Sequence, residues 1–187
     1  MGVVLDIIFS NLIRASIILL VLIAMVNLNN SLFRQNERVV LNTTVASTVE
    51  TIVNDVKLAG YGASTSKLFA KADSVEMSFY SDLGNDGSVK TVRYYLTGAS
   101  GTHRILYRTL NAGTAFEIAR DVVLFRLSYY SITGTSISGT NVSGVKSIKI
   151  TLTIESGQKL VSKYSGVSDS LTYQSATWEG QIFPSGL

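Results

Sequence analysis

The chain has 187 residues, 16% of them charged, with a net charge of +3 and no cysteine. The lack of cysteine excludes disulfides and thiolate metal sites. Its Lys and Arg residues are scattered and form no basic stripe of the kind that binds nucleic acid, so no nucleic-acid partner is expected. The length leaves about 125 residues beyond an N-terminal helix, enough for one domain with its own core.

The N-terminal segment is the most apolar part of the chain. Residues Val3–Val26 read VVLDIIFSNLIRASIILLVLIAMV, and Ala15–Phe33 carries no charge. A helix needs about 20 apolar residues to cross a bilayer core, so residues 1–27 are predicted to form a transmembrane or filament-core helix, with Asp6 and Arg14 as costly charges. A cleaved signal peptide is the alternative, but Met1–Leu5 has no Lys or Arg, and no small-x-small cleavage site ends the apolar run.

The helical pattern continues as an amphipathic helix over residues 28–60. Apolar residues recur on one helix face at Val45, Val49, Ile52, Val53 and Val56. Polar residues fall largely on the other faces, at Asn42, Thr44, Thr48, Asn54 and Asp55. Because no Pro or Gly interrupts Val3–Ala59, one continuous helix is predicted from about residue 3 to about residue 58. Gly60 can end it in a left-handed conformation.

Residues 61–187 change to a period of two and predict a β-rich globular head. Five segments are rich in β-formers or alternate apolar and polar residues: 75–80, 89–96, 104–110, 122–130 and 147–154. An antiparallel sheet packed on a helix typically has one buried face and one solvent-exposed face. The predicted fold class is therefore α+β, a long N-terminal helix packed on an antiparallel β-sheet. Turn residues separate the strands. Thr133–Gly144 is expected to be an exposed loop, and the C-terminal Trp178, Ile182 and Phe183 are expected to be tied into the domain.

Residues with catalytic or ligand chemistry are sparse. The single histidine, His103, has no second His, no Cys and no paired carboxylates with it in the sequence, so it is expected to be a solvated bystander. No enzyme and no cofactor are expected. Two Asn-x-Ser/Thr patterns, at Asn42 and Asn141, are common by chance and are assigned no role.

The segment Asp82–Gly87 has the alternate oxygens and the Gly of a calcium loop, which makes Asp82 and Asp86 metal candidates. However, Gly84 has no side-chain oxygen, and Arg93 stands where an EF-hand has its Glu. An Asp-Gly turn between two β segments already explains the pattern, so a plain hairpin is the preferred interpretation.

Four features occur in an order and spacing that are specific in combination. They are the apolar helix with its amphipathic continuation; the helix end Asn54–Gly62 (NDVKLAGYG), similar to a D-x-x-x-A-G-Y-G ending; Ile118–Val122 leading into Phe125 and Tyr129-Tyr130; and the closing Ile182-Phe183-Pro184-x-x-Leu187. With these features the chain resembles type IV pilins, most closely the minor pilins and pseudopilins of type IV pilus and type II secretion systems.

The resemblance implies a structural filament subunit. Such a subunit waits in the inner membrane and then assembles, with copies of itself or other pilin-like subunits, through its N-terminal helix. The head is extracytoplasmic, at the cell surface or in a filament that spans the periplasm. Gly2 stands for the cleavage glycine of prepilins, so Gly2 and Val3 are a candidate processing site, although Met1-Gly2 has no basic residue. Processing at Gly2, an unprocessed subunit and a different start codon all remain open.

Asp6 stands for the acidic residue near a mature pilin N-terminus, one position early. A carboxylate inside an apolar bundle needs a positive partner, so Asp6 and Arg14 are assembly candidates, Asp6 meeting Arg14 or a terminal amine of a neighbour. The alternative is that Asp6 only caps the helix start at the headgroup level.

Two other function classes remain. One is a membrane-anchored extracytoplasmic binding module whose helix is only an anchor; such a protein does not need a helix that continues past Phe33. The other is a membrane-tethered enzyme, for which the sequence offers no catalytic constellation. The sequence does not distinguish a major from a minor subunit, or a pilus from a secretion system.

Overall fold

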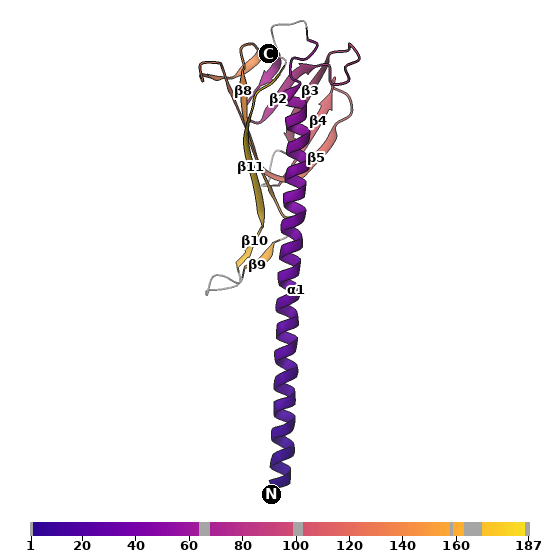
Figure 1. The fold of residues 1–187 in the computed structure, drawn as a ribbon, viewed down its shortest axis with the longest axis vertical. Coiled ribbons are helices and arrows are strands. Elements are labelled where there is room, and N and C mark those ends of the chain that lie inside the picture. Colours follow the sequence, from indigo (N-terminus) through magenta and orange to yellow (C-terminus); the bar gives the residue numbers. More distant parts are fainter. Residues whose placement is uncertain (1, 64–67, 99–102, 158, 163–169, 186–187) are drawn as a thin grey trace. The chain divides into compact units, whose positions relative to one another are not determined.

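A computed structural model describes residues 2–63, 68–98, 103–157, 159–162 and 170–185 (Figure 1). The chain divides into two compact units, Met1–Val39 and Val40–Leu187. Helix α1 (Gly2–Lys57) passes through the boundary between them. The described residues of the first unit are all helical, whereas the second unit contains the rest of α1 and all of the strands.

The predicted continuous helix is confirmed, because α1 runs from Gly2 to Lys57 without interruption. Its end also follows the prediction, since Gly60 has a φ of 86°, a left-handed conformation that glycine adopts without steric cost. The Gly60 N–H then donates a hydrogen bond to the carbonyl oxygen of Tyr80 at 2.7 Å. The helix end is thus joined to a strand of the head.

Nine strands of the described chain form one antiparallel sheet, in the order β11-β8-β5-β4-β3-β2-β1-β7 with β6 paired to β5. They are β1 (Phe69–Ala72), β2 (Glu76–Ser81), β3 (Lys90–Thr97), β4 (Arg104–Leu110), β5 (Phe116–Tyr130), β6 (Ser136–Ile137), β7 (Gly139–Val142), β8 (Ser147–Glu155) and β11 (Ser175–Ile182). A separate hairpin contains β9 (Leu160–Ser162) and β10 (Ser170–Thr172). The sheet curls around the part of α1 that belongs to the second unit (Figure 1). The predicted α+β fold class is therefore confirmed.

The core lies between α1 and the concave face of this sheet. The predicted stripe of α1 is buried at Val45, Val49, Ile52 and Val56 and half-buried at Val53. The sheet contributes large buried side chains, including Phe69, Phe79, Tyr94, Phe125, Tyr129, Ile148, Ile150 and Leu152. Each fully buried side chain of this size contributes about 1.5–3 kcal/mol. The second unit therefore has a complete core of its own.

Hydrogen bonds hold the sheet in its curled form. The Leu127 N–H on β5 donates to the Ser74 carbonyl oxygen, between β1 and β2, at 2.8 Å. The Tyr129 hydroxyl donates to the Asp73 carbonyl oxygen at 3.1 Å. β5 therefore contacts the β1–β2 turn directly, although several strands lie between them in the sheet order.

Two helix residues differ from the prediction. Thr48 and Asp55 were placed largely on the polar faces of the helix, but Thr48 is 2% exposed and Asp55 9% exposed. The Thr48 hydroxyl donates to the Ile118 carbonyl oxygen at 3.2 Å. Thr48 and Asp55 follow the buried Val45 and Ile52 by three residues and so share their helix face. Each has a polar partner on the sheet, which offsets the cost of burying a polar group.

The strand predicted at 122–130 is longer than expected, because β5 begins at Phe116. Asp121 has a φ of 54°, and the β5–β8 register shifts between Val122 and Leu124. Such irregularities are typical of a β-bulge, which bends a strand without ending it. The Arg120-Asp121 pair, which precedes the predicted strand, therefore lies at a bend inside one strand.

The segment Thr133–Gly144 was predicted to be a loop, and this prediction is wrong in part. It contains β6 and β7, which pair with β5 and β1. Most of its residues are exposed, as predicted, but Ile137 and Val142 pack against the core. Its Ser, Thr, Ile and Val residues tolerate extended backbone and add two short strands to the sheet.

The predicted attachment of the C-terminal segment is confirmed for Trp178 and Ile182, whereas Phe183 is 67% exposed. β11 pairs with β8 along its full length, and Ile182 is buried. The Ser185 N–H also donates to the Lys57 carbonyl oxygen at 2.8 Å, so the last described residues contact the end of α1.

Candidate functional site

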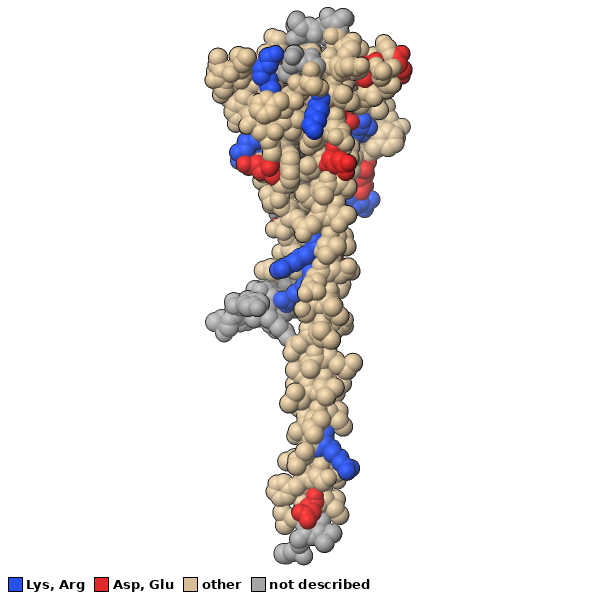
Figure 2. All heavy atoms as spheres, in the orientation of Figure 1, with Lys and Arg blue, Asp and Glu red and all other residues tan. Residues whose placement is uncertain are grey.

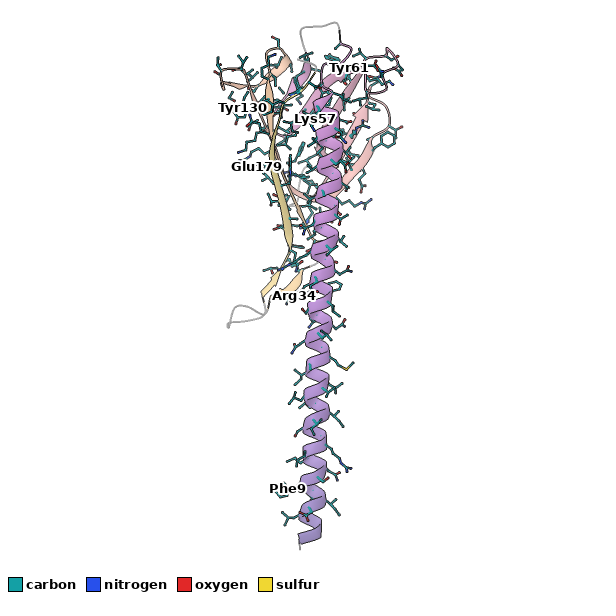
Figure 3. All side chains as sticks on the ribbon, viewed as in Figure 1. Phe9, Arg34, Lys57, Tyr61, Tyr130 and Glu179 are labelled. Carbon is teal, nitrogen blue, oxygen red and sulfur yellow. The ribbon has the colours of Figure 1, made fainter. Side chains whose placement is uncertain are left out.

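The first unit exposes its apolar side chains. From Leu5 to Phe33 every side chain of α1 is exposed, including Leu20 at 70% and Met25 at 63%. Phe9 projects outward from the helix (Figure 3), and charged side chains are few along this part of it (Figure 2). The helix is long and apolar enough to cross a membrane. Contiguous apolar surface of this extent marks an interaction site, and we call residues 5–33 the apolar helix surface.

Asp6 and Arg14, the predicted assembly residues, both lie on the apolar helix surface. Both are exposed, and neither has an ion-pair partner among the residues that the structure describes. They are eight residues apart, about 12 Å along the helix axis, so their side chains do not meet within one chain. Gly2 and Val3, the candidate processing site, are the first two residues of α1. Arg14 of the same chain is therefore not the partner of Asp6.

The metal candidates Asp82 and Asp86 lie in the turn between β2 and β3. The Asp82 carboxylate accepts hydrogen bonds from the N–H groups of Asp86 and Gly87, at 3.1 and 2.9 Å. The Asp86 carboxylate accepts the Ser88 N–H at 2.8 Å and pairs with Lys90 at 3.2 Å. Both carboxylates thus bind donors of their own turn. The structure brings the two residues together as parts of an antiparallel hairpin.

A buried polar cluster, which the sequence analysis missed, joins α1 to the sheet. The Asp55 carboxylate accepts hydrogen bonds from the Arg108 guanidinium, at 2.6 Å from Nε, and from the Tyr94 hydroxyl at 2.5 Å. Burial raises the pKa of Tyr94 well above its ordinary value, and the negative charge of Asp55 raises it further. Burial lowers the pKa of Arg108, but the hydrogen bond and charge of Asp55 outweigh burial and hold this pKa above its ordinary value.

The sequence does contain a signal for this cluster. Asp55 follows Ile52 by three residues and so shares its helix face. Arg108 shares a strand face with Leu106, and Tyr94 with Val92, because alternate residues of a strand point to the same side. Leu106 and Val92 are both fully buried. The three polar residues are therefore placed on buried faces by the same periodicities that predict the core.

The outer face of the sheet carries a second network. Glu76 accepts hydrogen bonds from Lys71 and from Arg93, both at 2.7 Å. The Arg93 guanidinium lies over the Tyr95 ring at 4.3 Å, and that ring stacks on Tyr107 with centroids 5.9 Å apart. Burial raises the pKa of Glu76, but the two cations outweigh burial and hold it below its ordinary value. The network joins β1, β2, β3 and β4 on the solvent side.

A surface groove of about 590 Å³ opens where β5 and β11 end and β8 begins. Its lining includes Tyr130, labelled in Figure 3, and two exposed apolar side chains, Ile132 at 83% and Phe183 at 67%. Two lysines also line it, of which Lys149 pairs with Glu179 at 2.8 Å. The groove combines apolar and cationic groups.

His103 differs from its prediction as a solvated bystander. Both ring nitrogens are buried, and they face the carboxylates of Asp121 and Glu155. The sequence could not bring these residues together, because His103 precedes β4 whereas Asp121 and Glu155 lie on β5 and β8. Within the described part of the chain, no group of three His, Cys, Asp or Glu side chains is placed to hold a metal ion.

Comparison with known proteins assigns no family to this chain. No family model matches it, and neither a curated protein nor a solved structure gives a significant match. Its function is therefore inferred from the residues and geometry described above.

Proposed function

We propose that the chain is a structural subunit of a type IV pilus-like or type II secretion pseudopilus-like filament. Before assembly the apolar helix surface lies in the inner membrane, with the head extracytoplasmic. On assembly the subunit exchanges lipid for the helices of other copies or of other pilin-like subunits. The filament then extends to the cell surface or spans the periplasm, and the heads coat its outside.

The observation that carries the proposal is the contrast within α1. Its first part exposes apolar side chains from Leu5 to Phe33, whereas its last part is buried in the head core. A simple membrane anchor does not need to continue as a regular helix past Phe33, but α1 continues to Lys57. Small and polar residues on the exposed part, such as Ser16 and Ala24, allow close helix contacts. This combination supports a helix that serves both a membrane and a bundle.

Asp6 has a specific role in this proposal. An unpaired carboxylate in an apolar bundle costs several kcal/mol. Pairing with Arg14 or a terminal amine of a neighbouring subunit would remove that cost only at the correct register. Processing between Gly2 and Val3 would supply such an amine close to Asp6. The charge would then select the assembled arrangement more than it stabilises it.

The first experiment uses the absence of cysteine from the chain. A single Ala24→Cys substitution places one thiol on the apolar helix surface without background. We expect the variant in filaments sheared from the cell surface, or in pseudopilus preparations, and we expect oxidation there to give disulfide-linked dimers. A protein that stays entirely in the membrane fraction would contradict the filament proposal.

The matched control combines Ala24→Cys with Asp6→Asn. Removing a charge makes membrane insertion easier, so this variant should enter the membrane normally. If Asp6 sets the register, filament yield and disulfide-linked dimers both decrease. Wild-type filament yield from both Asp6→Asn and Asp6→Ala would leave Asp6 as a helix cap only, without contradicting the filament itself.

A second candidate function is a membrane-anchored binding module, favoured by the groove beside Tyr130. Exposed Ile132 and Phe183 give this groove apolar contact area, and Lys146 gives it charge. The same shearing experiment distinguishes the two functions, because a binding module stays in the membrane fraction and its Ala24→Cys variant forms few dimers.

A further inference from the structure

The environment of His103 is unusual because each ring nitrogen faces a carboxylate. Nδ1 lies 3.4 Å from Oδ1 of Asp121, and Nε2 lies 3.7 Å from Oε2 of Glu155. Both nitrogens are buried, and neither makes a hydrogen bond in the structure. The Tyr173 ring lies against the imidazole with centroids 4.6 Å apart. His103 therefore lies at the meeting point of three sheet strands and the segment that leads into β11.

The backbone around Asp121 is bent where it meets His103. Asp121 has a φ of 54° and lies beside register shifts in both the β4–β5 and the β5–β8 pairings. Bulges of this kind redirect a side chain relative to a regular strand. Glu155 ends β8, and its neighbour Ile154 is buried, so alternation places Glu155 on the outer face. The two carboxylates thus reach His103 from adjacent strands.

The protonation state of the imidazole decides whether both contacts are favourable. A neutral histidine has one N–H, so one ring nitrogen would present its lone pair to a carboxylate. Both nitrogens are buried, and the groups that face them among the described residues are the two carboxylates. A protonated histidine has two N–H groups and a positive charge, which suit both carboxylates.

We propose that His103, Asp121 and Glu155 form a proton-dependent tie that holds together the edge of the head where β4, β5, β8 and the entry to β11 meet. In the protonated state the imidazolium bridges the carboxylates of β5 and β8. Loss of the proton removes one of the two attractions and loosens this edge. The tie would make the stability of the head depend on the pH outside the membrane.

Among the described residues, the other charged and titratable groups near this tie lie at its border. The Tyr173 ring lies against the imidazole, and the Lys159 ammonium lies over that ring at 5.4 Å from its centroid. Arg104 follows His103 in the chain, and its Nε is buried without a hydrogen bond. Arg120 precedes Asp121, but its guanidinium pairs with Glu117. Asp121 and Glu155 are thus the groups that face the ring nitrogens directly.

The first test observes the proton itself. The chain has one histidine, so ¹⁵N NMR of the full chain in detergent micelles reports His103 without overlap. If the tie forms, both ring nitrogens of the wild type should carry a proton at about pH 6.5. The Asp121→Asn and Glu155→Gln variants should each show a smaller protonated fraction at this pH. Equal protonated fractions in the wild type and both variants would overturn the proposal.

The second test measures what the proton does to stability. Trp178 is the only tryptophan and lies on β11, so its fluorescence follows urea unfolding of the head in the full chain. His103→Gln should raise the unfolding equilibrium constant by about tenfold at pH 5.5 and by less than about twofold at pH 8.5. The reason is that the proposed tie is present only while His103 is protonated. A loss that is the same at both pH values would show a packing role and overturn the proposal.

A matched control separates the proton from a metal ion. The same measurements in EDTA should be unchanged if a proton makes the tie. If EDTA removes the difference between wild type and His103→Gln, a bound cation makes the contact and the proposal is wrong. Tyr173→Phe keeps the ring against His103 and should leave the pH profile unchanged.

Discussion

The two parts of α1 carry similar apolar side chains in opposite surroundings. Ile17 in the first unit is 57% exposed, whereas Ile52 in the second unit is 1% exposed. Both lie in one uninterrupted helix, so secondary structure does not explain the difference. The second unit covers its helix with a curled sheet, and the first unit has only helix among its described residues.

This contrast separates the source of stability from the source of function. Apolar burial stabilises a fold only where another part of the chain covers the surface. The stability of the head therefore resides in Val40–Leu187. No other described residue covers the apolar helix surface, and in the proposed function lipid or other chains cover it. Mutations should affect these two properties independently, and the predictions below test that separation in order of decreasing effect.

Deletion of Met1–Val26 should have the largest effect, on solubility. We expect the remaining chain to be soluble without detergent and monomeric, because it lacks most of the apolar helix surface while the core from Leu41 to Ile182 is retained. Circular dichroism and size-exclusion chromatography check both points, with the full chain in detergent as the reference. An unfolded truncated protein would show that the stability of the head depends on the first unit, which would contradict the separation of the two units.

Loss of the Asp55 carboxylate should destabilise the head by about 3 kcal/mol. Asp55→Ala leaves the Arg108 charge and the buried Tyr94 hydroxyl without their shared partner. Urea unfolding followed by Trp178 fluorescence measures the change. Glu50→Ala, at an exposed acidic position of the same helix, is the control and should change the stability by less than about 0.5 kcal/mol. Equal effects of the two substitutions would show that the cluster contributes little.

The pair Ile17→Ala and Ile52→Ala tests the contrast most directly. Ile52→Ala should cost about 3 kcal/mol of head stability, because it removes buried methyl groups and leaves a cavity. Ile17→Ala should change the free energy of unfolding of the head by less than about 0.5 kcal/mol. In filament assays we expect the reverse order, with Ile17→Ala reducing assembly more than its stability effect can explain. A head destabilised equally by both would contradict the separation.

The sequence predicts the parts of the fold that rest on periodicity. The continuous helix, the buried stripe from Val45 to Val56 and the alternating strand at 147–154 follow from patterns of 3.6 and 2 residues. The short strands β1, β6 and β7 have too few residues for a pattern. Their position depends on the curling of the sheet. This curling involves contacts between residues far apart in the chain, such as the hydrogen bond from Leu127 to Ser74.

The candidate sites differ in the same way. Asp6 and Arg14 can be identified from sequence because a charge in an apolar run is conspicuous, but the described residues include no ion-pair partner for either of them. Helix periodicity places Asp55 on the buried face, but its partner Arg108 lies 53 residues later in the chain. The surroundings of His103 depend on a bulge at Asp121, which no local pattern of apolar residues predicts. Local sequence thus indicates which residues are unusual, while the tertiary structure determines what they contact.

The smallest predicted effect is confined to the turn between β4 and β5. Asn111 and Ala112 have φ values of 52° and 55°, and the Gly113 N–H donates to the Leu110 carbonyl oxygen at 2.8 Å. Two successive left-handed residues are typical of a type I′ turn, which favours Gly at its second central position. Ala is strained there by about 1–2 kcal/mol, while Gly adds entropy to the unfolded chain. Ala112→Gly should therefore stabilise the head by about 0.5–1 kcal/mol.

Ala115→Gly is the matched control for that turn. Ala115 is exposed and does not have a positive φ, so Gly there relieves no strain and should destabilise the head by about 0.5 kcal/mol through backbone entropy. Urea midpoints of the two variants should thus move in opposite directions. Because the turn belongs to the second unit, membrane association and filament yield should stay at the wild-type level in both. A change in filament yield from Ala112→Gly would show that head stability limits assembly, and the two regions would then be coupled.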